Sequence, residues 1–265
     1  MRTCSACGTQ RSLELFQRGP LAQQAGEPES TVCRPCWYAE QELQEAQEAH
    51  RRDLEILDTK VREDLAARGL SPRELKADMA KVKPAIRAAV PKKALEALLA
   101  GRRPEYGFGL GGNTGGGKTM ALAAILKVSA AAQYKSFQPQ ARCRFGGACM
   151  GMVWTSWPDE VTWLRKNAIE DTAAARVDRL STCSLLVLDD LGRERIKGSY
   201  AEDWAASQLD AVINHRYRHE LPILWTTNVP EVDLAALYGG AMLSRLTGDN
   251  PLAWVHNLQD QRGER

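Results

Sequence analysis

Apolar residues recur at intervals of three and four along residues 37–68, a stretch that contains neither glycine nor proline. This spacing places them on one face of an α-helix, and charged side chains fill the other faces. The pattern predicts one long, exposed amphipathic helix or a short coiled coil, which ends at Gly69. The apolar positions are Leu43, Ala46, Leu54, Leu57, Val61 and Leu65.

Residues 69–104 are divided into short pieces by prolines. Ser71 and Glu74 have the spacing of a capping box, and Pro72 suits the first turn of a new helix. We therefore expect a hinge-like connector made of short helical segments. The later breaks fall at Pro84, Pro91 and Pro104.

From Tyr106 onward, short apolar runs alternate with helical stretches. This alternation predicts an α/β fold with a mostly parallel sheet and helices on both faces. Ser156 and Ser199 are the expected N-caps of two of the helices. The expected strands are residues 108–110, 152–155, 185–188 and 223–227, and the expected helices are residues 119–134, 157–167 and 199–219.

The chain has 265 residues, which is enough for one full α/β domain and a smaller appendage. Residues 1–36 are rich in glycine, proline, serine and cysteine and show little periodicity. We therefore expect a small module at 1–36, a helical linker at 37–104 and the α/β domain at 105–265.

The formal net charge of +2 is too close to zero to indicate nucleic-acid binding by itself. The charge is unevenly distributed, however. Residues 37–70 carry nine acidic and five basic residues, whereas residues 71–104 carry nine basic and three acidic residues. The second segment reads either as a basic contact surface or as a solvated helical linker.

No apolar run approaches the ~18 residues that a membrane span needs, and the N-terminus lacks the apolar stretch of a signal peptide. We therefore expect a cytoplasmic protein without a membrane partner.

Residues 112–119 match the pattern G-x-x-x-x-G-K-[ST] at every fixed position, between an expected strand and an expected helix. The glycines let backbone amides turn toward phosphate oxygens. Lys118 can reach the β- and γ-phosphates, and the Thr119 hydroxyl can ligate Mg²⁺. A glycine-rich turn without a ligand is the alternative. The expected nucleotide contacts are Gly112, Asn113, Thr114, Gly115, Gly116, Gly117, Lys118, Thr119 and Met120.

Two expected buried strands end in polar residues. Asp189 and Asp190 follow the first strand, where one carboxylate can hold Mg²⁺ and the next can polarise an attacking water. Asn228 follows the second strand and can orient that water, or simply belongs to the turn before Pro230. Arg245 is either an ordinary surface residue or an arginine that reaches a neighbouring subunit's phosphate.

Taken in order, these motifs resemble the DnaC/IstB family of AAA+ ATPases, which are replicative-helicase loaders and their transposition-helper relatives. The resemblance covers about residues 100–250. Its motifs are the phosphate loop and residues 188–192, 213–217, 226–228 and 244–246.

This resemblance implies ATP as the nucleotide and a P-loop AAA+ fold. It makes Lys118 and Thr119 the Walker A residues, and it makes Asp189 the Walker B magnesium residue. Asp190 takes the position where many AAA+ proteins have a catalytic glutamate, and Asn228 takes the position called sensor 1.

The resemblance also implies that Arg245 is an arginine finger that acts across a subunit boundary, and hence that the active form is a homo-oligomer. Arg216 is a weaker candidate, for an intersubunit or a structural role. Cys143 and Cys149 match no motif of this family, and together with Cys183 they read as reduced thiols. We expect Cys183 at the edge of the core.

Four of the seven cysteines form two tight pairs, separated by 25 residues. Four thiolates give a closed tetrahedral Zn²⁺ site, and metal binding would supply folding energy to a polar segment that has no core of its own. A redox-active pair is the runner-up, although the flanking βαβ context is missing. The expected zinc ligands are Cys4, Cys7, Cys33 and Cys36.

Residues 1–36 contain four arginines and three glutamates, which favours a protein partner over DNA for this module. Some helicase loaders resemble this layout, with an N-terminal zinc domain that docks on the helicase and an ATPase domain that engages single-stranded DNA. The leading hypothesis is therefore such a loader. The alternatives are a transposition helper and a nucleotide-gated adaptor with negligible turnover.

Overall fold

The computed structural model describes residues 1–12, 32–136, 151–167, 171–193 and 199–256. Contacts between residues divide the chain into two units, Met1–Asp58 and Thr59–Arg265. The three-part division expected from the sequence stays a prediction. Cys143 and Cys149 lie outside the described residues, as do the side chains of the cap expected at Ser199.

The N-terminal unit begins with a small antiparallel ladder between β1 (Arg2–Thr3) and β2 (Gln10–Arg11). Helix α2 (Arg34–Ala67) begins in this unit and ends in the second. The long helix expected at 37–68 is thus confirmed, and it starts three residues earlier. Pro35 falls in the first turn, where its missing N–H removes no helical hydrogen bond.

Helix α2 ends before Gly69, as predicted, because the backbone at this position requires glycine. Its φ of +112° belongs to a region that side-chain-bearing residues rarely adopt. A Cβ atom at this position would also collide with the carbonyl oxygen of Trp154. The Trp154 amide in turn donates a hydrogen bond of 2.8 Å to the carbonyl of Arg68. The helix end is therefore fastened to a strand of the second unit.

The connector after Gly69 consists of short elements, as the prolines predict. They are the 3-10 turns η2 (Glu74–Lys76) and η3 (Met79–Lys81), and the helices α3 (Pro84–Ala89) and α4 (Lys92–Leu99). The capping box before η2 is present, because the Ser71 amide donates to Glu74 Oε2 at 2.7 Å. The turn that follows is a 3-10 turn and not the expected α-helix.

Among the described residues of the second unit, five parallel strands form one sheet in the order β4-β5-β6-β3-β7. The predicted parallel sheet is confirmed, and the edge strand β7 was not anticipated. The bounds are β3 (Phe108–Gly112), β4 (Met152–Ser156), β5 (Leu185–Leu191), β6 (Ile223–Thr227) and β7 (Leu252–Val255).

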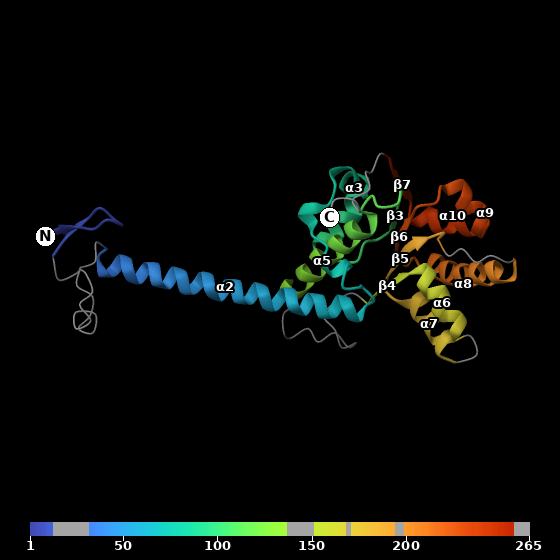
Figure 1. Ribbon diagram of the computed structural model, residues 1–265, viewed down its shortest axis with the longest axis horizontal. Helices are drawn as coiled ribbons and strands as arrows, with labels where there is room; N and C mark the ends of the chain where they lie inside the picture. The colour runs from blue at the N-terminus through green and yellow to red at the C-terminus, as the bar shows by residue number, and fades with distance from the viewer. Residues whose placement is uncertain (13–31, 137–150, 168–170, 194–198, 257–265) are drawn as a thin grey trace. The chain divides into compact units, whose positions relative to one another are not determined.

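Helices cover both faces of this sheet (Figure 1). Helices α3 and α5 lie on one side, and α6 to α10 lie on the other. On the second side, alternate strand residues such as Leu186, Leu188 and Trp225 pack against α6 to α10 in one apolar core. The helix bounds are α5 (Lys118–Ser136), α6 (Trp157–Lys166), α7 (Asp171–Thr182), α8 (Ser199–Arg218), α9 (Glu231–Tyr238) and α10 (Gly240–Asp249).

Three of the expected helices correspond to α5, α6 and α8, whereas α7, α9 and α10 were missed. The predicted cap of α6 is right in position only: Ser156 is the N-cap residue, but its side chain makes no capping hydrogen bond. No helix among the described residues is long and apolar enough to cross a membrane.

Candidate nucleotide site and cysteine cluster

The loop between β3 and α5 has the backbone conformation that its glycines allow. Gly112, Gly115 and Gly117 have φ angles of +142°, +78° and +94°. Such positive values let successive amides face inward and form an anion-binding concavity. Helix α5 begins at Lys118, so the positive end of its dipole also faces the loop.

Lys118 is 5% exposed, and its ammonium group is surrounded by oxygen atoms. It donates to the carbonyls of Gly112 at 2.7 Å and Asn113 at 2.9 Å, and to Asn228 Oδ1 at 2.8 Å. These acceptors hold the cation at the mouth of the phosphate loop. Phosphate oxygens entering the loop can replace them without moving the lysine far.

Thr119 and Asp189 meet at the carboxyl ends of the strands. The Thr119 hydroxyl donates to Asp189 Oδ1 at 2.8 Å, and the Thr226 hydroxyl donates to the same oxygen at 2.6 Å. The pKa of Asp189 is raised to about 6, mainly by burial and also by the carboxylates of Asp190 and Glu74, against the opposing hydrogen bonds from the two hydroxyls. A buried carboxylate beside a threonine hydroxyl is a suitable oxygen donor set for Mg²⁺.

Asp190 and Asn228 form the second half of the site. Asn228 Nδ2 donates to Asp190 Oδ1 at 3.1 Å, and Arg193 pairs with Asp190 Oδ2 at 2.9 Å. Asp190 has a φ of +56°, which is unusual for a residue with a side chain. The backbone amide of Asp190 donates a hydrogen bond of 3.0 Å to the hydroxyl oxygen of Thr226. The turn therefore aims the carboxylate of Asp190 at Asn228 instead of along the strand.

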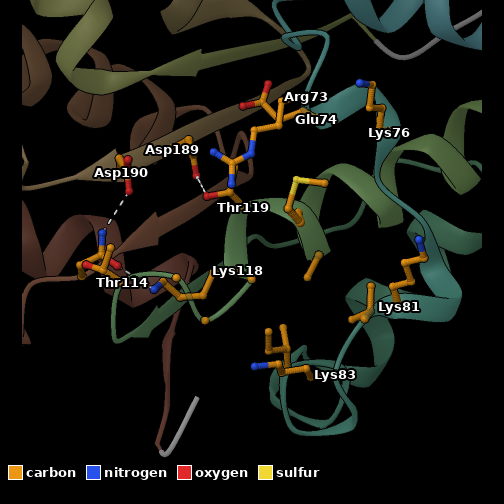
Figure 2. Close-up of a pocket in the computed structure, with 18 of the residues that line it drawn as sticks. Arg73, Glu74, Lys76, Lys81, Lys83, Thr114, Lys118, Thr119, Asp189 and Asp190 are labelled. Carbon is orange, nitrogen blue, oxygen red and sulfur yellow. Dashed lines mark hydrogen bonds between the residues drawn. The ribbon is translucent and has the colours of Figure 1, made fainter. Parts of the chain in front are cut away.

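These residues line one cavity of about 750 Å³ (Figure 2). Its floor is the phosphate loop with Met120, and the carboxylates lie at one end. The connector also lines the cavity and contributes four cations that the sequence did not assign to a site. Those cations are Arg73, Lys76, Lys81 and Lys83.

The structure brings together the predicted site residues of the loop and both strand ends: Thr114 to Met120, Asp189, Asp190 and Asn228 all line the cavity, and Gly112 and Asn113 hold Lys118. Arg245 is different. It lies on α10 and pairs with Asp210 of α8 at 3.1 Å, and it does not line the cavity.

Sequence reasoning missed Thr226 and Arg193. Thr226 was noted only as part of a motif, although its hydroxyl contacts both aspartates. Arg193 lies three residues after Asp190, a spacing that lets the two side chains pair across a tight turn.

Two roles were considered for Arg216, one between subunits and one structural, and its contacts support the structural role. It is fully buried and donates to the carbonyls of Leu180, Cys183 and Pro222 at 2.8 to 2.9 Å. These contacts tie α8 to the end of α7 and to the start of β6. Cys183 packs partly buried against the core of this unit, at its edge as expected.

In the N-terminal unit, the sulfur atoms of Cys4, Cys7, Cys33 and Cys36 all lie within 4.8 Å of one another. The β1–β2 hairpin supplies the first pair, and the start of α2 supplies the second. The amide of Cys33 donates to Cys4 Sγ at 3.3 Å, which joins the two halves. The four predicted ligands are therefore together, and they can hold a metal ion.

The electrostatics of these sulfurs favour a cation at their centre. Hydrogen bonding to the sulfur of Cys33 and then of Cys7 raises the pKa of Cys36 to about 12. Four adjacent thiols therefore cannot all ionise unless positive charge compensates them. A divalent ion with thiolate preference satisfies this requirement, and four donors complete a tetrahedral shell.

The raised pKa of Asp189 gives a prediction about stability. The folded state holds this proton more tightly than the unfolded chain, whose value is near 3.8. Stability therefore falls as pH rises from ~4 to ~6, by about 3 kcal/mol for two pKa units. Asp189→Asn, which keeps an oxygen acceptor for both threonines, should raise the melting temperature of the nucleotide-free protein at pH 7.5 by several degrees.

Differential scanning calorimetry at pH 7.5 and at pH 4 measures this effect. The gain should shrink at pH 4, where wild-type Asp189 is itself protonated. Asp190→Asn, at the less buried neighbour, is the control and should give no such gain. A melting temperature that Asp189→Asn lowers equally at both pH values would contradict the assignment.

The phosphate loop after β3, which lies between β6 and β7, together with acids and an asparagine at the ends of β5 and β6, defines a P-loop AAA+ fold. This confirms the fold class expected from the sequence. Solved structures with the same fold include DnaI, at 19% identity and a TM-score of 0.52, covering 73% of this chain and 95% of that one.

The DnaC helicase loader is similar at 22% identity and a TM-score of 0.50, covering 70% of this chain and 99% of that one. The replication initiator DnaA bound to AMPPCP and single-stranded DNA is similar at 20% identity and a TM-score of 0.51, covering 73% of this chain and 53% of that one. No protein-family model matches the sequence, and no curated protein matches it either.

Proposed function

We propose that this protein binds Mg²⁺-ATP in the cavity above the phosphate loop and hydrolyses it. The observation that carries the proposal is the hydrogen-bonded chain Lys118–Asn228–Asp190 beside the pair Thr119–Asp189. Two groups suited to phosphate and metal thus lie next to two groups suited to positioning water. The AMPPCP-bound DnaA structures, which share the fold, support the choice of an adenine nucleotide.

In this proposal the loop amides and Lys118 hold the β- and γ-phosphates, and Thr119 with Asp189 holds Mg²⁺. The metal supplies charge neutralisation between the phosphates when it is bound. Asp190 accepts a proton from the attacking water. Asn228 now bridges Lys118 and Asp190, and it orients that water once phosphate occupies the lysine.

We further propose that the ATPase acts in the cytoplasm as a helicase loader, with the zinc-binding cysteine module as the docking site for a replicative helicase. Its ATPase unit would engage single-stranded DNA. The fold shared with the DnaC helicase loader and DnaI supports this role. The low net charge near the cysteine cluster suits a protein partner better than DNA.

The decisive experiment is a pull-down from the cognate cell extract with the full chain, with and without ATP, followed by mass spectrometry. Retention of a hexameric replicative helicase supports the loader role. Retention of a transposase instead favours the transposition-helper alternative. A helicase-loading assay on circular single-stranded DNA then tests whether the captured helicase is delivered in an ATP-dependent manner.

Arg245 should matter for turnover across a subunit boundary. Arg245→Ala is expected to lower the hydrolysis rate by at least ~100-fold while leaving ATP affinity within about threefold, because an arginine finger stabilises charge in the transition state. Steady-state phosphate release and equilibrium titration with AMPPCP measure the two quantities. An equal loss of affinity and rate would argue for a role within the same subunit.

Asp210→Asn is the matched control for that variant. It removes the carboxylate that now pairs with Arg245 at 3.1 Å but keeps the arginine. This pair is partly exposed and contributes little to stability. The control should therefore retain turnover, and mixing Arg245→Ala with Lys118→Ala protein should restore part of the activity if the finger acts between subunits.

A further inference from the structure

The 3-10 turn η2 lies over the carboxylate end of the nucleotide cavity. Arg73 and Glu74 line the cavity together with Thr119, Asp189 and Asp190. In Figure 2 the side chain of Arg73 extends from the connector toward Thr119 and Asp189. Lys81 and Lys83 lie apart from this end, on the far side of the same cavity.

The position of Arg73 is fixed by its own turn. The Ser71 amide donates to Glu74 Oε2 at 2.7 Å, and the Glu74 amide donates back to Ser71 Oγ at 3.5 Å. The Ala77 side chain that follows is buried, and η2 packs against α5. The backbone at Arg73 is thereby held against the helix that carries Lys118 and Thr119, while the guanidinium side chain itself stays exposed.

Two other cations, Lys118 and Arg193, lie at this end of the cavity and contact oxygen atoms. Lys118 donates to three oxygens at the mouth of the loop, and Arg193 pairs with Asp190 at 2.9 Å. Thr119 and Asp189 would hold a metal ion, which would supply charge neutralisation to the terminal phosphates. A cation next to that pair therefore meets the terminal phosphate of the nucleotide.

We propose that Arg73 contacts the γ-phosphate of the nucleotide bound in its own chain, and that this contact lets the site distinguish a nucleoside triphosphate from a diphosphate. The inference rests on the proposed function and deepens it. A guanidinium offers two parallel N–H donors to one phosphate group, which a lysine cannot match. The connector between α2 and the ATPase sheet thus becomes part of the nucleotide site.

The test is calorimetric titration of the full-length protein with Mg²⁺-AMPPCP and with Mg²⁺-ADP. Arg73→Ala should weaken AMPPCP binding by about tenfold and change ADP binding by less than twofold. Arg73→Lys, which keeps the charge but loses the fork of donors, should recover only part of the loss. Lys92→Ala is the matched control, because Lys92 is an exposed cation on α4 that does not line the cavity.

Each outcome decides the matter. A selective loss for AMPPCP supports the inference. An unchanged affinity, or equal losses for both nucleotides, overturns it while leaving the ATP site intact. Wild-type protein that binds neither nucleotide overturns the proposed function itself, and the inference with it. Circular dichroism of each variant confirms that an affinity change does not come from unfolding.

Discussion

Lys118→Ala should reduce the affinity for Mg²⁺-ATP by two orders of magnitude or more and bring ATP hydrolysis to background. The ammonium group is the buried cation of the phosphate loop, with 5% of the residue exposed. A hydrogen bond to a charged group contributes about 1.5–3 kcal/mol, and this lysine is expected to make contacts to two phosphates. Titration with AMPPCP and an assay of phosphate release measure the two losses separately.

Lys135→Ala is the matched control, because Lys135 is an exposed lysine in the last turn of the same helix α5. It should leave both quantities unchanged. Removing Lys118 also leaves three oxygen acceptors without their donor, so the melting temperature of the variant must be compared with that of wild type. Unchanged hydrolysis by a folded Lys118→Ala protein would reject the site.

The placement of the candidate site residues in one cavity could be predicted, because they lie in one loop or at strand ends. The loop at 112–119 has a fixed spacing, and parallel strands bring Asp189 and Asn228 to one edge of the sheet. The hydrogen bonds between Thr226 and both aspartates could not be predicted, because they depend on the register between β5 and β6. Thr226 lies 37 residues after Asp189 in the sequence. Arg73 depends likewise on how the connector folds back over α5.

The glycines of β3 show why propensity misleads for the fold. They give residues 108–112 a low strand propensity, yet β3 is flanked by β6 and β7 in the sheet. A side chain at Gly109 would occupy the position of the Trp225 ring, and one at Gly111 would collide with the Trp254 ring. The glycines are therefore required by cross-strand tryptophans, which local sequence cannot reveal.

The missed elements have a similar explanation. Helices α9 and α10 are short and meet at Gly239, whose φ is +85°, so they lack a sustained helical period. Strand β7 has only four residues and is recognisable only through its parallel pairing with β3. Asn250 stabilises this arrangement, because its Oδ1 accepts hydrogen bonds from the backbone amides of Gly107 and Ile223, at 3.1 and 2.8 Å.

Cys33→Ser should abolish metal binding and unfold the N-terminal hairpin, while nucleotide binding by the second unit persists. The strands β1 and β2 have two residues each, too few for a stable hairpin in water. The small buried cluster at the cysteines consists of Cys4 and Cys33, with Val32 and Cys36 packed against it. We therefore expect the folding of this unit to depend on a bound metal ion, whose binding in comparable peptides contributes about 10–16 kcal/mol.

Elemental analysis should find one Zn²⁺ in wild-type protein and none in Cys33→Ser, and limited proteolysis should cleave the variant selectively within the first 36 residues. Cys183→Ser is the control, since Cys183 lies in the second unit, outside the cluster. Because Met1–Asp58 and Thr59–Arg265 are separate contact units, AMPPCP affinity should stay within about twofold. A metal-free protein with an intact, protease-resistant N-terminus would show that the cysteines fold this unit without zinc.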